Sequence, residues 1–151
     1  MILRKSFRCA ALASAIFLAA GTTAFAADAW QLGKQAFAGA DYSAALDYFE
    51  SARDTGQAGP AVHYNIGVCQ YKLARYRDSE VTFSLIARQF PRMRGLAEYN
   101  LGLVDLKLGD TSAAEQHFLS AYELSADDET LRALSSNMLF RTDVETESPA
   151  S

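Results

Sequence analysis

Few residues of this chain have the types and spacing that catalysis or metal binding requires. Its only histidines are His63 and His117, and neither stands at a metal-ligand spacing from Cys69 or from a pair of carboxylates. Cys69 falls on an apolar helical stripe, where a buried and unreactive thiol is expected. His63 is expected to be packed inside the protein and His117 to lie at its surface. The sequence therefore predicts no enzyme, no metal site and no cofactor.

Aromatic and amide side chains are the residues whose spacing favours binding chemistry. Trp30, Tyr64 and Tyr99 recur at intervals of 34 and 35 residues, and Asn65 and Asn100 directly follow the two tyrosines. Aromatic rings offer a large contact area, and a side-chain amide can both donate to and accept from a peptide backbone. This combination favours the gripping of a peptide, either extended or helical.

These residues belong to a repeated unit of about 34 residues. Segment 64–73 matches segment 99–108, and a third copy lies around Leu32 and Gly33. A period of this length is typical of helical arrays. Each copy continues into a second half whose small, aromatic and apolar residues follow one another at i, i+4 and i+7: Ala45, Phe49 and Ala52; Ser79, Phe83 and Ile86; Ala114, Phe118 and Ala121. This spacing places them on one face of a helix.

Each unit is therefore predicted to be a pair of amphipathic helices joined by a tight turn. Gly33, Gly67 and Gly102 in the first helices are expected to let the paired helices cross closely. Asp41 and Asp110 follow the turns as expected N-caps. Helices are predicted at 28–39, 43–55, 61–74, 77–89, 96–108 and 112–125, with a seventh at about 128–141 that covers the open face of the third unit.

The residues named above resemble the tetratricopeptide repeat (TPR), whose pattern has Leu-Gly in the first helix and Ala, Phe and Ala in the second. The resemblance covers residues 26–127. It implies an all-α fold, a right-handed superhelical stack of three helical hairpins with a C-terminal capping helix. The TPR domain is placed at 27–141, with repeats at about 26–59, 60–94 and 95–128 and the capping helix at about 128–141.

The resemblance further implies that the first helix of each hairpin lines a concave groove. The residues expected there are Trp30, Gln31, Lys34, Phe37, Tyr64, Asn65, Val68, Tyr71, Lys72, Leu96, Tyr99, Asn100, Leu103, Leu106 and Lys107. Some members of the family hold a C-terminal carboxylate with Lys and Arg. Leu96 and Asn100 occupy the corresponding positions here, so such a clamp is not expected. The alternative is that these side chains only pack the repeats together as a scaffold.

The first 26 residues have the three parts of a secretory signal in order. A basic start is followed by an apolar stretch at 10–20 and by the small-residue site Ala24-Phe25-Ala26. Cleavage is predicted after Ala26, which implies a periplasmic or secreted protein. The alternative, an uncleaved anchor, is disfavoured because the run is barely long enough to span a bilayer and is diluted with small and polar residues.

The charge of the chain narrows the class of partner. Its formal net charge is −4, and the predicted signal carries three basic residues but no acidic one, so the remainder is more acidic still. An acidic protein is a poor ligand for nucleic acid, and no membrane span is expected after cleavage. Five arginines around 75–94 form a basic cluster that is expected to make local ion pairs, with the docking of an acidic partner as the alternative. The acidic tail at 142–151 is expected to be disordered.

The sequence therefore predicts a periplasmic interaction module that binds a partner peptide or segment, in envelope assembly or secretion. Two alternatives of another kind remain. In the first, the chain is an N-terminal periplasmic scaffold or a truncated piece of a larger envelope protein. In the second, it is a scaffold that assembles into homo-oligomers without a peptide ligand.

Overall fold

The computed structural model describes residues 29–57 and 59–147, with side chains up to residue 142. The described residues form helices and turns without any strand, which confirms the predicted all-α class. The chain divides into two compact units, residues 1–62 and 63–151, and each is described by itself. The predicted signal at 1–26 lies outside the described residues.

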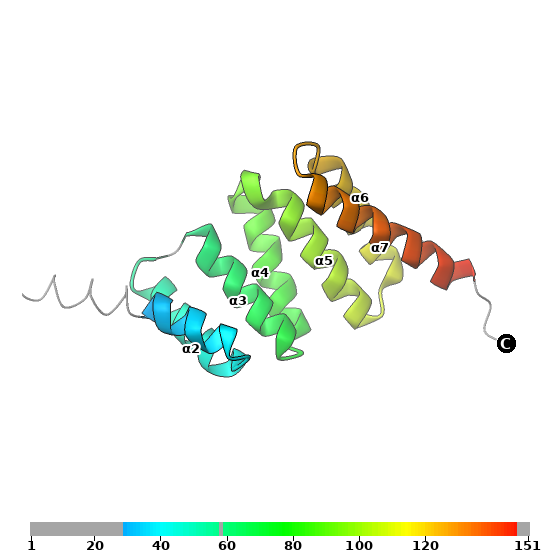
Figure 1. Cartoon of the computed structure of the whole chain (residues 1–151). Helices are drawn as coiled ribbons and strands as arrows, with labels where there is room; N and C mark the ends of the chain where they lie inside the picture. The colour runs from blue at the N-terminus through cyan, green and yellow to red at the C-terminus, as the bar shows by residue number, and fades with distance from the viewer. Residues whose placement is uncertain (1–28, 58, 148–151) are drawn as a thin grey trace, which may run out of the picture. The chain divides into compact units, whose positions relative to one another are not determined.

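The helices alternate with short turns along the chain (Figure 1). The first unit has a helix over residues 29–38 and a second helix, α2. The second unit contains two hairpins, α3 with α4 and α5 with α6, followed by α7. The bounds are α2 Tyr42–Asp54, α3 Pro60–Lys72, α4 Tyr76–Gln89, the short 3-10 helix η1 Pro91–Met93, α5 Arg94–Leu108, α6 Thr111–Leu124 and α7 Glu129–Glu147.

The predicted N-caps of α2 and α6 form as their residue types predict. The Asp41 carboxylate accepts a hydrogen bond from the backbone N–H of Ala44 at 3.1 Å, and Asp110 accepts one from Ala113 at 2.9 Å. Each bond satisfies a backbone donor that the first turn of a helix leaves without a partner. Gly109 ends α5 in the left-handed region, at φ 83°, where a residue without Cβ is favoured.

The paired helices touch where the sequence places glycine in the first and phenylalanine in the second. A Cβ at residue 67 would lie 2.9 Å from Cζ of Phe83, and one at residue 102 would lie 2.6 Å from Cε1 of Phe118. In the first unit a Cβ at residue 33 would lie 2.6 Å from Cε1 of Phe49. The predicted role of these glycines in close helix crossing is therefore confirmed.

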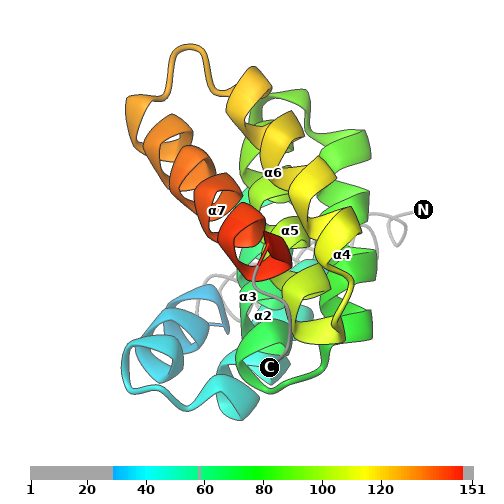
Figure 2. The same ribbon diagram turned by 90° about the vertical axis from the view of Figure 1, so that its right-hand side faces the viewer.

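The core of the second unit runs from one hairpin into the next. Phe83 and Ile86 of α4 pack with Ala97, Leu101 and Val104 of α5 in one buried cluster. A second buried cluster contains Ala114, Phe118 and Met138, from α6 and α7. In Figures 1 and 2, α3, α5 and α7 form one layer of this unit, and α4 and α6 form the other.

Helix α7 covers α6 as predicted but extends beyond its predicted end. It runs to Glu147 instead of stopping near 141, so the first part of the predicted tail is helical. The reason is that its buried stripe continues to Thr142, after Leu131, Ser135 and Met138. Thr142 also donates a hydrogen bond from its hydroxyl to the carbonyl oxygen of Leu139, at 2.8 Å.

Candidate partner-binding face

The predicted aromatic residues of the second unit pack against the second helix of their own hairpin. Tyr64 meets Phe83 with ring centroids 6.0 Å apart, and Tyr99 meets Phe118 at 5.7 Å. Tyr71 packs edge-on against a fourth tyrosine at 5.6 Å. These three tyrosines are only half-buried, so each ring is fixed by the core on one side and open to solvent on the other.

The three tyrosines form one group, although they come from two helices. The pKa of the Tyr99 phenol is raised by burial and by the phenol of Tyr64, while the cationic Arg141 partly lowers it. The pKa of Tyr71 is raised by burial and by its electrostatic interaction with Tyr76 and Tyr99. Such interactions require the groups to lie near one another, so Tyr99 of α5 lies near Tyr64 and Tyr71 of α3, which both pack against the buried cluster of α4 and α5.

Four other predicted residues follow Tyr64 and Tyr99 at i+4 and i+8, which keeps them on the same side of α3 and α5. Val68 packs against the buried cluster of α4 and α5, and Leu103 against that of α6 and α7. Lys72 and Lys107 are exposed. We define the inner face of the second unit as the side of α3, α5 and α7 that carries the following residues: Tyr64, Val68, Tyr71, Lys72, Tyr99, Leu103, Leu106, Lys107, Phe140 and Arg141. The last two belong to α7 and are described below.

The two predicted asparagines are partly occupied by structural contacts. The Asn100 side-chain amide donates to the carbonyl oxygen of Leu96, one turn earlier in α5, at 2.7 Å. Its carbonyl oxygen and second amide hydrogen remain for a ligand. Asn65 is half-buried. The sequence pattern did not indicate the hydrogen bond between Asn100 and Leu96, because that bond depends on the rotamer of the Asn100 side chain.

The predicted residues of the first unit have their own arrangement. Trp30 packs on Phe49 with centroids 5.3 Å apart, and the Lys34 ammonium lies 5.5 Å from the centroid of the Trp30 ring. Phe37 meets Tyr42 edge-on at 5.4 Å. Gln31 is exposed. Trp30 and Phe37 thus repeat the half-buried packing of the tyrosines in the second unit.

Two residues of α7 belong to the same surface and were missed from the sequence. The buried residues of α7 stand 34 positions after their counterparts in α5, as Leu131 follows Ala97 and Met138 follows Val104. The same offset places Phe140 and Arg141 at the positions of Leu106 and Lys107. Phe140 is 69% exposed, and Arg141 interacts electrostatically with Tyr99. Extending the 34-residue period into the capping helix would have identified both residues.

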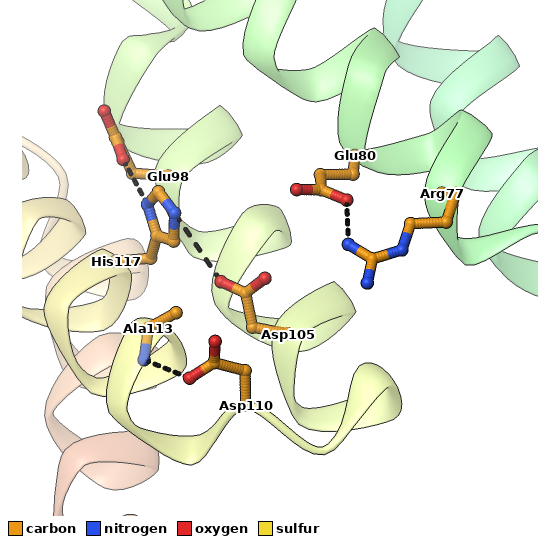
Figure 3. Close-up of polar contacts among 7 residues, drawn as sticks. All are labelled: Arg77, Glu80, Glu98, Asp105, Asp110, Ala113 and His117. Carbon is orange, nitrogen blue, oxygen red and sulfur yellow. Dashed lines mark hydrogen bonds and ion pairs between the residues drawn. The ribbon is translucent and has the colours of Figure 1, made fainter.

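A polar cluster between α5 and α6 is the other arrangement with chemical potential (Figure 3). His117 lies between two buried carboxylates: its Nδ1 is 2.8 Å from Oε2 of Glu98, and its Nε2 is 3.5 Å from Oδ2 of Asp105. The side chain of His117 is 34% exposed, so it reaches the surface as predicted, but its contacts with two buried carboxylates of α5 were not predicted. Sequence spacing did not reveal the contact because residues 98 and 117 lie on different helices.

This cluster joins α6 to α5 and does not resemble a catalytic site. Both imidazole nitrogens face carboxylates, so the ring presents no free nitrogen to a substrate. Burial raises the pKa of the Asp105 carboxyl, and the charge of His117 acts in the opposite direction. Oδ2 of Asp105 is buried without a hydrogen bond from any described group. Among the described residues no group of His, Cys, Asp and Glu is arranged to hold a metal ion.

The remaining predicted features are local. Cys69 is buried, and burial raises the pKa of its thiol to about 11, which makes the thiolate scarce at neutral pH. In the arginine cluster, Arg75 pairs with Asp78 at 2.8 Å and Arg77 with Glu80 at 2.9 Å, as expected for local ion pairs. No helix within the described part of the chain is long and apolar enough to cross a membrane.

Comparison with known proteins shows the fold. No family model matches the chain, and no curated protein matches it. The structure is similar to PcrH in complex with the chaperone binding region of PopD, with TM-score 0.72, 21% identity, and coverage of 80% of this chain and 92% of that one. It is also similar to the type III secretion translocator chaperone SycD of Yersinia enterocolitica, with TM-score 0.73, 18% identity, and coverage of 80% and 85%.

A third similar structure is the complex of the TPR2B domain of yeast Sti1 with pHsp70, with TM-score 0.71, 13% identity, and coverage of 80% of this chain and 98% of that chain. The likeness at these identities concerns the fold, which is a TPR-like array of helical hairpins. The predicted periplasmic or secreted location is contradicted by these comparisons and is corrected here. The neighbours that overturn it are chaperones of type III secretion, PcrH and the translocator chaperone SycD.

Proposed function

We propose that this chain is a protein-interaction module of the tetratricopeptide type, which binds a segment of a partner protein on the inner face of α3, α5 and α7. The observation that carries the proposal is the group formed by Tyr64, Tyr71 and Tyr99. Each ring is held on one side by an aromatic neighbour, so little side-chain entropy remains to be lost on binding. Fixed aromatic side chains of this kind are typical anchors in protein interfaces.

The comparisons support a binding role over a catalytic one. PcrH is described in complex with the chaperone binding region of PopD, and SycD in complex with a peptide of the translocator YopD. Both are helical-hairpin proteins that take a segment of another chain. The cluster of Glu98, Asp105 and His117 favours no enzyme, because its imidazole is occupied on both sides.

Site-specific photo-crosslinking tests the proposal. A photoreactive amino acid replaces Lys107 on α5, and a matched variant carries it at Glu115 on α6; both positions are exposed. In cells that produce the full chain, we expect the first variant to capture a short segment of a discrete protein, located by mass spectrometry. The second variant should capture none of it. Equal capture at both positions, or capture at neither, would contradict binding on the inner face.

A further inference from the structure

The inner face carries a row of three cations at one repeated position. Lys72, Lys107 and Arg141 are separated by 35 and 34 residues, so they hold the same register in α3, α5 and α7. All three are exposed. We call them the cation row. Because successive first helices of a repeat array present the same face, residues at one register position form a line across that face.

The cation row makes no ion pair with the side chains described up to residue 142, in contrast to other basic residues of the same unit. Among the side chains that the structure describes, none of the three cations lies within ion-pairing distance of a carboxylate. Arg75, Arg77 and Arg94 each pair with an acidic residue three or four positions further on. In a chain with net charge −4, acidic side chains are available, yet none of those described pairs with the row.

A structural role in the helices explains only part of the row. Lys72 and Lys107 stand in the last turns of α3 and α5, where a cation interacts favourably with the helix dipole. Arg141 does not stand in the last turn of its helix, because α7 continues to Glu147. The Arg141 guanidinium instead acts on the phenol of Tyr99 and makes one weak contact, of 3.9 Å from its Nη1 to Sδ of Met138. The dipole of its own helix therefore does not explain the position of Arg141.

From this row we infer that the partner segment is acidic, with carboxylate side chains facing Lys72, Lys107 and Arg141 and apolar side chains facing the tyrosines and Phe140. The inference rests on the proposed function and specifies its ligand. Neighbouring packed helices lie about 8–10 Å apart, and an extended chain advances about 3.3 Å per residue. An extended segment that matches the row carries about one carboxylate in every three residues.

The ligand recognised in this way differs from a C-terminal carboxylate. The charges lie on side chains along the segment, so blocking its C-terminus as an amide leaves binding unchanged. Phe140 adds an apolar contact beside Arg141, since it is 69% exposed at the neighbouring position. A carboxylate next to an apolar side chain in the partner therefore fits the α7 end of the inner face.

A display library of random twelve-residue peptides, selected on the full chain, tests the inference. We expect enrichment of Asp and Glu together with apolar residues. An enriched acidic peptide, made synthetically with blocked ends, should bind at least about tenfold more weakly to the triple variant K72E/K107E/R141E. Reselection on that variant should enrich Lys and Arg instead. R92E is the matched control, because Arg92 is exposed and outside the row, and it should change neither result.

The outcomes separate the inference from the function on which it rests. Enriched peptides without an acidic bias that still protect Lys107 from chemical acetylation would overturn the acidic ligand and leave segment binding in place. A library that enriches no sequence, or peptides that protect no inner-face residue, would overturn both. If the triple variant instead abolishes self-association of the full chain in sedimentation, a second copy is the occupant and the inference of a separate acidic partner is wrong.

Discussion

At the scale of single residues, the contact of His117 with Glu98 and Asp105 shows how a buried charge is tolerated in this fold. A buried carboxylate is costly unless hydrogen bonds or a cation compensate it. Glu98 has two partners, His117 at 2.8 Å and the more exposed Arg94 at 3.4 Å. Asp105 has only the 3.5 Å approach of His117. The two carboxylates therefore differ in how well the fold compensates them.

Replacing Asp105 by Asn should stabilise the protein at neutral pH. Burial raises the pKa of this carboxyl in the folded state, so its ionisation costs folding energy that appears as the pH rises above the unfolded value of 3.8. We expect D105N to raise the free energy of unfolding by about 1 kcal/mol at pH 7. The gain should vanish near pH 3.5, as measured by urea denaturation followed by circular dichroism. A gain that persists unchanged at pH 3.5 would contradict this origin.

Replacing His117 by Gln should have the opposite effect. The variant leaves the buried Glu98 and Asp105 without the imidazole that they share, at a cost of about 1–3 kcal/mol. The cost should fall by at least half in the D105N background, because one of the two stranded carboxylates is then absent. Urea denaturation of the single and double variants at pH 7 measures the coupling, and strictly additive effects would show that His117 and Asp105 do not interact.

At the scale of the helices, the crossing within each hairpin depends on the absence of a side chain at one position. The space at Gly102 is filled by the ring of Phe118, and the space at Gly67 by that of Phe83. Where the repeat has Ser79 in place of alanine, the hydroxyl is satisfied inside the crossing by a 2.9 Å bond to the carbonyl oxygen of Gly67. The crossing of α3 and α4 at Gly67 thus combines close packing against Phe83 with a hydrogen bond for the Ser79 hydroxyl.

Adding a methyl group at Gly102 should therefore destabilise the second hairpin of its unit. The new Cβ would lie 2.6 Å from an atom of a fully buried ring, and overpacking of this kind costs about 1–3 kcal/mol. G102A should lower the thermal midpoint by several degrees in differential scanning calorimetry. The matched control is G59A, where nothing lies within 4 Å of the added Cβ. Equal midpoints for the two variants would show that the ring moves aside freely.

The N-cap of α6 offers a second test at the same scale. D110A removes the 2.9 Å bond to the backbone N–H of Ala113 and should cost about 1 kcal/mol of unfolding free energy in urea. D110N retains an acceptor oxygen and should recover most of the loss. If both substitutions cost the same, the negative charge at the start of α6 is the stabilising factor and the hydrogen bond is not.

At the scale of the whole molecule, the charge balance contrasts with the local row of cations. The chain has a formal net charge of −4 and an isoelectric point of about 5.1, while Lys72, Lys107 and Arg141 stand unpaired among the described side chains on one face. Exposed apolar residues are also present, Val81 and Phe140 being the most exposed of the large ones described. Repulsion between copies of the chain is therefore expected to oppose their association through these apolar residues.

Solubility should consequently pass through a minimum near the isoelectric point. As the net charge approaches zero, repulsion between copies disappears and the exposed apolar side chains can associate. We expect turbidity of the full chain at low salt to be greatest near pH 5.1 and to clear at pH 7.5. The variant F140S should reduce the turbidity at the maximum. Turbidity that does not depend on pH would show that association is independent of net charge.

The sequence by itself determined the elements of this protein and how each hairpin closes. The 34-residue period located the helices, the Asp caps fixed the starts of α2 and α6, and the Gly–Phe crossings set the pairing. These features depend on residues close together in the chain or at one fixed period, so pattern alone revealed them.

Only the tertiary structure decided which polar and aromatic groups meet. His117 reaches Glu98 across two helices, Arg141 approaches Tyr99 from α7, and α7 itself continues to Glu147. Each of these depends on rotamers and on the packing of helices distant in sequence, which periodicity does not specify. The register of α7 makes the predicted cap part of the inner face, because a helix that repeats the buried stripe of α5 also repeats the side that α5 leaves exposed.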